Sequence, residues 1–340
     1  VLNPWFTVEY NREREKLFYF ALQLHKEFLL SSKCCASNFR NLLLLWGFDK
    51  DDEKKQVRFS ERDRRACFSA LLNTVFLLTP VLSTTFASAG SMLSDIRGPG
   101  EIGYLIIDEA GQAQPQMAVG ALYRCRRALV VGDPKQVEPV VTDDMDAIKR
   151  IIRNDFNYLY QSKSRSVQEF ADRINPLGAY FTEMELDQKT WVGCPLVVHR
   201  RCISPMYEIS NEISYNNTMK QQTAGPKRED EAHFCMDGSA WINVGGSEND
   251  SNGKDHFVKN QGDKTLELIL KAFEKSNGEP DLFVITPFTT VKDGIMKMVR
   301  AQSELKEKPN ISEWIESHIG TVHTFQGKEA AEVIFLLGCD

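Results

Sequence analysis

Short apolar runs that end abruptly at polar residues stand out along the chain. Tyr104–Ile107 stops at Asp108-Glu109, and Ala128–Val131 stops at Gly132-Asp133. A brief apolar run bounded by turn residues is typical of a strand buried on both faces, as in a parallel sheet. The roughly twenty residues between the runs are enough for one crossover helix. Two acidic sites are therefore predicted at the carboxyl ends of neighbouring parallel strands, where open α/β sheets bind ligands.

The rest of the hydrophobic pattern alternates between helical and strand-like spacing. Residues 10–30 place Leu17, Phe20 and Leu24 at helical spacing, with charges on the other face, which predicts an amphipathic packing helix. A second helix is predicted over 60–78, with Ser60 as a candidate N-cap. Further strands are predicted at Val81–Thr85, Trp241–Val244, Leu282–Thr286, Thr321–Thr324 and Glu332–Leu337, and further helices from about Pro205, over 262–275 and over 288–302.

This alternation of strands and helices in both halves predicts an α/β protein with two domains. A length of 340 residues fits that number. Pro176-Leu177-Gly178 is a natural boundary. The expected domains are residues 1–178, with a helical part over 1–80, and residues 179–340.

Charge and hydropathy narrow the functional classes. The net charge of -6 argues against a protein that binds nucleic acid by bulk charge alone, although a local basic groove remains open. No apolar run approaches the roughly 20 residues of a membrane span, so no membrane partner is expected. The chain shows no signal peptide and does not begin with Met, and we expect that an upstream part has been removed.

The eight cysteines form no CxxC pair and no CxxC…HxxxH spacing, so they do not predict a metal site. A disulfide framework is unusual in a chain of this length, which favours a reducing compartment. The expected location is therefore cytoplasmic, or nuclear if the source is eukaryotic.

Asp108-Glu109 after an apolar strand is the Walker B arrangement of nucleoside triphosphatases. In that arrangement the Asp holds Mg²⁺ and the Glu can polarise the attacking water. Taken alone, the pattern also fits two acids that end a strand without any chemistry. The segment Gly132-Asp133-Pro134-Lys135-Gln136 at the next strand end favours the chemical interpretation, because a Gln there can sense a γ-phosphate and position water.

Six segments in the order and spacing of helicase motifs carry a family resemblance. IIDEAGQA (106–113) is similar to motif II, and VVGDPKQVEPVV (130–141) is similar to motif III. STTFASAGS (83–91) is similar to the nucleic-acid-contacting motif before motif II, HRRCISPMYEISNEISYNN (199–217) to the arginine-bearing segment, ITPFTTVKDGI (285–295) to motif IV and TVHTFQGKEAAEVIF (321–335) to motif V. Over most of residues 81–338 the chain resembles superfamily 1 helicases, in the branch of the nonsense-mediated-decay helicase and the Dna-two-type helicase-nucleases.

The resemblance implies two RecA-like parallel-sheet domains of a P-loop NTPase helicase, the first incomplete at its N-terminus. It also implies an ATP-dependent helicase or translocase that moves along single-stranded DNA or RNA. In the family's arrangement Asp108 holds Mg²⁺, while Glu109 and Gln136 act on the water and the γ-phosphate. Arg201, chosen over Arg200 from the motif register, matches the arginine that reaches the γ-phosphate from the second domain.

The same motif match implies further binding residues. Asp133, Gly327 and Glu329 are expected on the nucleotide side. Five residues are expected to touch the sugar-phosphate backbone: Thr84, Thr85, Thr286, Thr321 and His323. Hydroxyl groups suit this role, because phosphate contacts position a protein without reading sequence. For each single threonine, a strand-end hydroxyl that bonds the local backbone remains an equal alternative.

The sequence departs from the family pattern in two places. No GxxxxGK[ST] motif is present, since Gly253-Lys254 and Gly327-Lys328 lack the hydroxyl residue and the preceding glycine. The arginine-bearing helix that follows motif V in the family is also missing. We expect a fragment of a longer helicase that is inactive alone; the alternative is a catalytically dead helicase fold that acts as an interaction scaffold.

Overall fold

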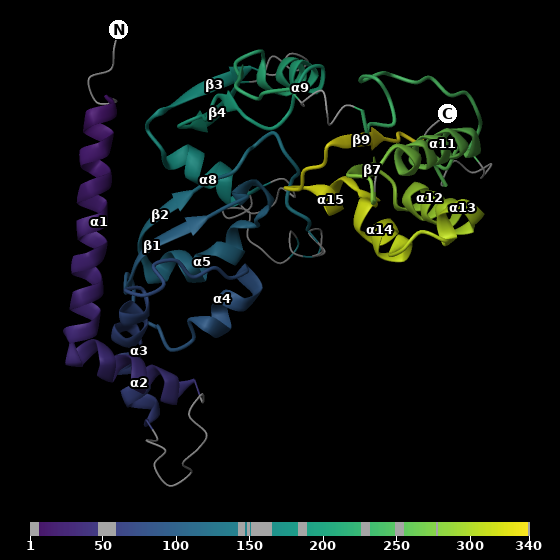
Figure 1. The fold of residues 1–340 in the computed structure, drawn as a ribbon. Helices are drawn as coiled ribbons and strands as arrows, with labels where there is room; N and C mark the ends of the chain where they lie inside the picture. The colour runs from purple at the N-terminus through teal and green to yellow at the C-terminus, as the bar shows by residue number, and fades with distance from the viewer. Residues whose placement is uncertain are drawn as a thin grey trace. The chain divides into compact units, whose positions relative to one another are not determined.

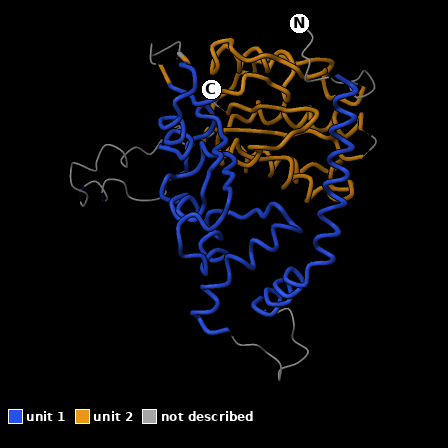
Figure 2. Tube along the Cα trace, turned by 90° about the vertical axis from the view of Figure 1, so that its left-hand side faces the viewer, with its two compact units in different colours: residues 1–180, 191–194 blue, residues 181–190, 195–340 orange. Residues whose placement is uncertain are grey.

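The structure is a computed structural model. It describes residues 7–46, 59–141, 147, 150, 165–182, 189–225, 232–248, 255–276 and 278–338. The chain divides into two compact units (Figure 2). Unit 1 comprises Val1–Tyr180 and Trp191–Cys194, and unit 2 comprises Phe181–Thr190 and Pro195–Asp340.

Unit 1 begins with helices and continues into a parallel strand pair. Its elements are α1 (Val8–Ser31), α2 (Lys33–Leu45), α3 (Glu61–Val75), α4 (Phe86–Met92), β1 (Ile102–Ile107), the short 3-10 helix η2 (Ala110–Gln112), α5 (Pro115–Arg124), β2 (Cys125–Val130) and α8 (Val167–Ile174) (Figure 1). Strands β3 (Gly178–Thr182) and β4 (Lys189–Gly193) follow in the chain, each with residues assigned to both units, and they pair in a sheet of their own.

The predicted pair of parallel strands with a crossover helix is confirmed. β1 and β2 pair in parallel from Ile102 opposite Cys125 to Ile107 opposite Val130. α5 makes the crossover and begins with a proline, whose fixed φ suits the first turn of a helix. The prediction that both faces of these strands are buried was wrong, because Ile106 and Leu129 on one face are more than half exposed.

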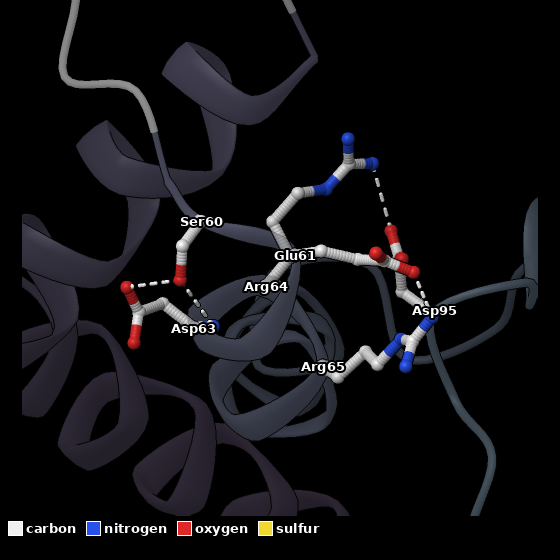
Figure 3. Close-up of polar contacts among 6 residues, drawn as sticks. All are labelled: Ser60, Glu61, Asp63, Arg64, Arg65 and Asp95. Atoms are coloured by element: carbon white, nitrogen blue, oxygen red, sulfur yellow. Dashed lines mark hydrogen bonds and ion pairs between the residues drawn. The ribbon is translucent and has the colours of Figure 1, made fainter.

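Helix α3 begins where the sequence predicted. The hydroxyl oxygen of Ser60 accepts a hydrogen bond from the Asp63 backbone N–H at 3.1 Å and thereby caps the helix (Figure 3). Arg64 on the same helix pairs with Asp95 at 2.8 Å, which ties α3 to the segment before β1. Behind these contacts, a core formed by Leu42, Phe68, Leu71, Leu72, Leu93, Ile96 and Ile102 holds α2 and α3 against the start of β1.

Two sequence predictions for unit 1 were wrong. Val81–Thr85 forms no strand, because the Thr85 hydroxyl accepts from the Ser88 backbone N–H at 3.3 Å and starts α4 instead. α1 forms over the expected range, but the described part of the chain does not bury its apolar face. None of its residues is buried, and Leu17 and Leu24 are 70% and 73% exposed.

Unit 2 contains a three-stranded parallel sheet covered by helices. Its elements are β5 (Val198–His199), α9 (Met206–Tyr215), β6 (Lys220–Gln221), α11 (Lys259–Lys275), β7 (Leu282–Thr286), α12 (Thr289–Ala301), α13 (Ser303–Lys306), α14 (Ile311–His318), β8 (Ile319–Thr321), α15 (Val322–Phe325) and β9 (Glu332–Phe335) (Figure 1). The central strand β7 pairs in parallel with β8 on one side and β9 on the other.

The core of unit 2 follows from the helical spacing of its apolar residues. Val291, Ile295 and Val299 recur every four residues on α12 and are each 1% exposed. They share one cluster with Trp314, whose indole N–H donates to the Pro280 carbonyl at 3.0 Å. The indole nitrogen is therefore satisfied inside the core, as burial of a polar atom requires.

Two predicted strands of unit 2 were also wrong. Trp241–Val244 has no strand pairing, and Trp241 is 81% exposed. Thr321 is the last residue of β8, and a helix follows it, because the side chains of Thr321 and Thr324 form a capping box at the start of α15. Within the described part of the chain, no helix has both the length and the apolar character needed to span a bilayer.

Candidate functional site

The acidic pair at the end of β1 is arranged by its own backbone. Glu109 adopts the left-handed conformation, with φ 52° and ψ 39°, directly after Asp108. The Glu109 backbone N–H donates to Oδ1 of Asp108 at 2.9 Å, and Oε2 of Glu109 accepts from Nε2 of Gln112 at 3.0 Å. Both acidic residues are exposed. Their carboxylates therefore lie at the solvent-facing end of the strand, each fixed by one short-range hydrogen bond.

The loop after β2 brings Asp133 and Gln136 together. Oδ1 of Asp133 accepts from the Lys135 backbone N–H at 2.9 Å, and Oδ2 accepts from Nε2 of Gln136 at 3.1 Å. The Gln136 backbone N–H also donates to the Asp133 carbonyl at 3.3 Å. The carboxylate thus holds the glutamine amide in a defined place at the end of the strand.

Backbone hydrogen bonds continue past both strand ends and join the two loops. The Val131 N–H donates to the Ile107 carbonyl at 2.8 Å, and the Ala110 N–H donates to the Val131 carbonyl at 2.9 Å. The predicted meeting of the two acidic segments at one sheet edge is therefore present in unit 1.

Two glycines let these loops approach closely. A Cβ at Gly111 would lie 2.8 Å from the Asp133 carbonyl oxygen. A Cβ at Gly132 would lie 2.8 Å from the Gly111 nitrogen and 2.9 Å from the Ala110 nitrogen. These are backbone atoms, which cannot rotate away as a side chain can. Glycine is required at both positions because each loop rests directly on the backbone of the other.

In unit 2 the structure brings Arg201 and Glu329 together. Nε of Arg201 donates to Oε1 of Glu329 at 2.7 Å, across 128 positions of sequence. The side chains are 56% and 67% exposed, so solvent screens this ion pair strongly. The sequence assigned both residues to the nucleotide side, and it held no signal that they pair with each other.

The backbone beside Arg201 is fixed by neighbouring polar groups. The Cys202 N–H donates to Nε2 of His199 at 2.7 Å. The Cys202 carbonyl accepts from Nε2 of Gln221 at 3.1 Å. Burial raises the pKa of the Cys202 thiol, and the nearby Arg201 acts in the opposite direction. Arg201 therefore projects from a segment that is held on both sides.

The predicted nucleic-acid contacts of unit 1 lie just before α4. Thr84 and Thr85 are both exposed. The Thr84 hydroxyl donates to the Thr85 carbonyl at 3.4 Å, and Thr85 caps α4. Both hydroxyls thus make the local contacts that the sequence left open as an alternative, and a role toward nucleic acid stays a prediction.

The predicted contacts of unit 2 differ in exposure. Thr286, at the end of β7, is fully buried, and its hydroxyl accepts from the Phe288 N–H at 3.4 Å. Thr321 is partly exposed, and His323 is exposed in the short α15. Gly327 lies beyond α15 with φ 76°, a conformation that favours glycine. A contact from Thr286 to nucleic acid requires that its surroundings open first.

Comparison with protein families identifies both halves of the chain. Two family models, each described as an AAA domain, match residues 48–144 and 181–338. Together they cover most of the chain, and both motif-bearing strand ends of unit 1 fall inside the first match. The chain belongs to the superfamily 1 helicases. This membership confirms the family resemblance and the α/β class with two RecA-like domains.

Curated relatives agree with the helicase assignment. The chain is 21% identical over 291 residues to "Regulator of nonsense transcripts 1" of Dictyostelium discoideum, which covers 84% of this chain and 19% of that protein. It is 19% identical over 229 residues to the Neurospora crassa homolog of that regulator, covering 66% and 18%. A 74-residue stretch is 36% identical to "Probable helicase senataxin" of Mus musculus, covering 20% and 3%. This helicase chain spans less than a fifth of the length of these relatives.

Proposed function

We propose that this chain supplies motor residues of an ATP-dependent helicase or translocase, which couples ATP hydrolysis to movement along single-stranded DNA or RNA. The observation that supports the proposal best is the junction of the two loops in unit 1. Asp108 and Glu109 end one strand, Asp133 and Gln136 follow the next, and backbone contacts lock the loops together. A change in one loop therefore has to alter the other.

The acidic groups of unit 1 fit a magnesium-bound triphosphate. Mg²⁺ prefers oxygen ligands and is commonly held by one or two carboxylates together with substrate phosphates. Asp108 is the residue that would hold the ion, which supplies charge neutralisation on the phosphates when bound. Glu109 would accept a proton from the attacking water, and its hydrogen bond from Gln112 keeps the carboxylate oriented.

The remaining roles belong to residues that respond to the phosphates. Gln136 would donate its amide toward the γ-phosphate and report its presence through Asp133. Arg201 of unit 2 would stabilise the charge that develops on the phosphates during transfer, after leaving Glu329. The hydroxyls of Thr84, Thr85 and Thr321 would position the sugar-phosphate backbone of the nucleic acid.

We also propose a reducing intracellular location, from the cysteine usage of the chain.

Replacing Glu109 with glutamine tests the proposal in the full-length protein. Glu109→Gln should lower nucleic-acid-stimulated ATP turnover by about 10²- to 10⁴-fold, the usual contribution of a positioned general base. Binding of a fluorescent ATP analogue should be unchanged, since the substitution keeps size and shape. Glu304→Gln, at an exposed position of α13, is the matched control. Full turnover in Glu109→Gln would contradict the role of Glu109, and a wild-type protein without stimulated turnover would contradict the proposed function.

A further inference from the structure

Helix α8 carries two buried polar residues on one face. Gln168 and Asp172 are one helical turn apart and are 5% and 4% exposed. Burial without hydrogen bonds is costly for an amide and more so for a carboxylate. Their partners therefore indicate what the two side chains hold in place. Neither residue belongs to the helicase segments recognised in the sequence.

Asp172 holds the strand β4. Its Oδ1 accepts from Nε2 of Gln168 at 2.9 Å and from the Gly193 backbone N–H at 2.9 Å. Its backbone carbonyl accepts from the indole N–H of Trp191 at 3.0 Å. A Cβ at Gly193 would lie 3.1 Å from the same Oδ1, so glycine permits this close approach. Two residues of β4 are thus fixed by one aspartate.

The other end of Gln168 faces the loop after β2. Its Oε1 is buried and has no hydrogen-bond partner among the described residues. A Cβ at Gly132 would lie 3.0 Å from this oxygen. The same point is 2.8 Å from the Gly111 nitrogen, so the amide oxygen of Gln168 sits where the two loops meet. Gly132 therefore lies against the Gln168 amide, and a shift of Gly132 toward α8 would press on this oxygen.

The segment that Asp172 holds has a particular place in the chain. Trp191–Cys194 belongs to unit 1, while the residues on both sides of it, Phe181–Thr190 and Pro195 onward, belong to unit 2. The chain therefore returns to unit 1 for four residues before it continues into unit 2 toward Arg201. The hydrogen bonds of Asp172 are made within this returning segment.

We propose that Gln168 and Asp172 are positioning residues that couple the loop of Gly132, Asp133 and Gln136 to the returning segment Trp191–Cys194. The coupling rests on the proposed function, because it would carry the state of the γ-phosphate toward the part of the chain that leads to unit 2. A shift of Gly132 displaces the Gln168 amide and weakens the hydrogen bond from this amide to Asp172. The hydrogen bond from the Gly193 N–H to the same carboxylate then weakens too. α8 transmits the shift because Val167 anchors its first turn, where the Val167 N–H donates to the Ala113 carbonyl at 2.9 Å.

Amide hydrogen exchange tests the coupling in the full-length protein without nucleotide. Gly132→Ala should speed exchange in peptides covering 191–194 by about two- to tenfold, the factor that corresponds to one weakened buried hydrogen bond. Gln168→Met has a similar volume but no amide, and as a single substitution it should speed exchange in the same peptides. In the Gln168→Met background, Gly132→Ala should add nothing. Equal effects of Gly132→Ala in both backgrounds, or no effect of Gln168→Met, would overturn the proposal.

Turnover gives the second readout. Asp172→Asn keeps an acceptor oxygen at Oδ1 and should retain the nucleic-acid stimulation of ATP turnover. Asp172→Ala should lower stimulated kcat by about two- to tenfold, as expected for the loss of one or two hydrogen bonds, with KM for ATP unchanged. Equal loss in both variants would also overturn the coupling. If the wild-type protein lacks stimulated turnover, the proposed function fails, while the exchange experiment still decides whether the two segments are linked.

Discussion

Gly132→Ala is the sharpest structural test of the joined loops in unit 1. The added Cβ would lie 2.8 Å from the Gly111 nitrogen and 2.9 Å from the Ala110 nitrogen, where favourable contacts need about 3.5 Å or more. The φ of Gly132 is not in the left-handed region, so alanine can adopt the backbone itself. The cost therefore comes from overpacking, against the backbone of the other loop and against the Gln168 amide oxygen at 3.0 Å.

The expected loss of unfolding free energy can be taken from overpacked sites in other proteins. Extra carbon in a closely packed place typically costs about 1–3 kcal/mol of unfolding free energy. For a unit of this size that corresponds to a fall of about 2–12 °C in Tm. Gly90→Ala in α4 is the matched control, because a Cβ there meets no atom within 4 Å. It should leave Tm unchanged or raise it slightly, since alanine favours a helix over glycine by about 0.5–1 kcal/mol.

Thermal unfolding followed by circular dichroism in one buffer measures both variants. The expected order of Tm is Gly90→Ala at or above wild type, and Gly132→Ala below it. A Gly132→Ala protein as stable as wild type would refute the close packing of the loops. An equal loss in both variants would show that the effect belongs to alanine substitution in general and not to the junction.

Other predictions concern ionisation and activity. Burial raises the pKa of Asp172 above its unfolded value near 4, so the contribution of this carboxyl to stability is present at low pH and is lost as pH rises through the folded pKa. At pH 7, Asp172→Asn should therefore unfold at a higher urea concentration than wild type. This difference should close toward pH 4. Burial raises the pKa of the Cys235 thiol to about 12, so mass spectrometry at pH 8 should find iodoacetamide on the exposed Cys34 and Cys67 long before Cys235. Residues 1–340 alone, which contain no GxxxxGK[ST], should show no Mg²⁺-dependent ATP hydrolysis above the level of a Glu109→Gln control.

Local signals in the sequence were enough for the strands and helices that carry the acidic loops. The apolar runs before Asp108 and Gly132 predicted β1 and β2, because a short apolar run with a sharp polar end is typical of a strand, even though one face of this pair is exposed. Ser60 predicted the start of α3, because an N-cap hydrogen bond joins residues only three positions apart. Both features are decided within a short window of sequence.

The features that the sequence missed depend on partners far away. Val81–Thr85 has the pattern of a strand, but a strand also needs a neighbour, and the Thr85 cap satisfies the local backbone instead. The apolar spacing of α1 predicted a packing face, yet spacing alone does not supply the surface that covers it. The pairing of Arg201 with Glu329 and the place of Gln168 against Gly132 join segments that only the folded chain brings together. The roles assigned to the site residues remain predictions from the motif match.

In the role proposed for Arg201, its ion pair with Glu329 would make phosphate recognition an exchange of counter-ions. A guanidinium that already has a carboxylate partner presents little net charge to an approaching anion, so the phosphate must displace Glu329 rather than fill an empty place. Because the pair is exposed, displacement lowers the apparent affinity by at most about fivefold. Added salt weakens both the old pair and the new one. Nucleotide binding through Arg201 should therefore depend less on ionic strength than binding to an unpaired arginine would.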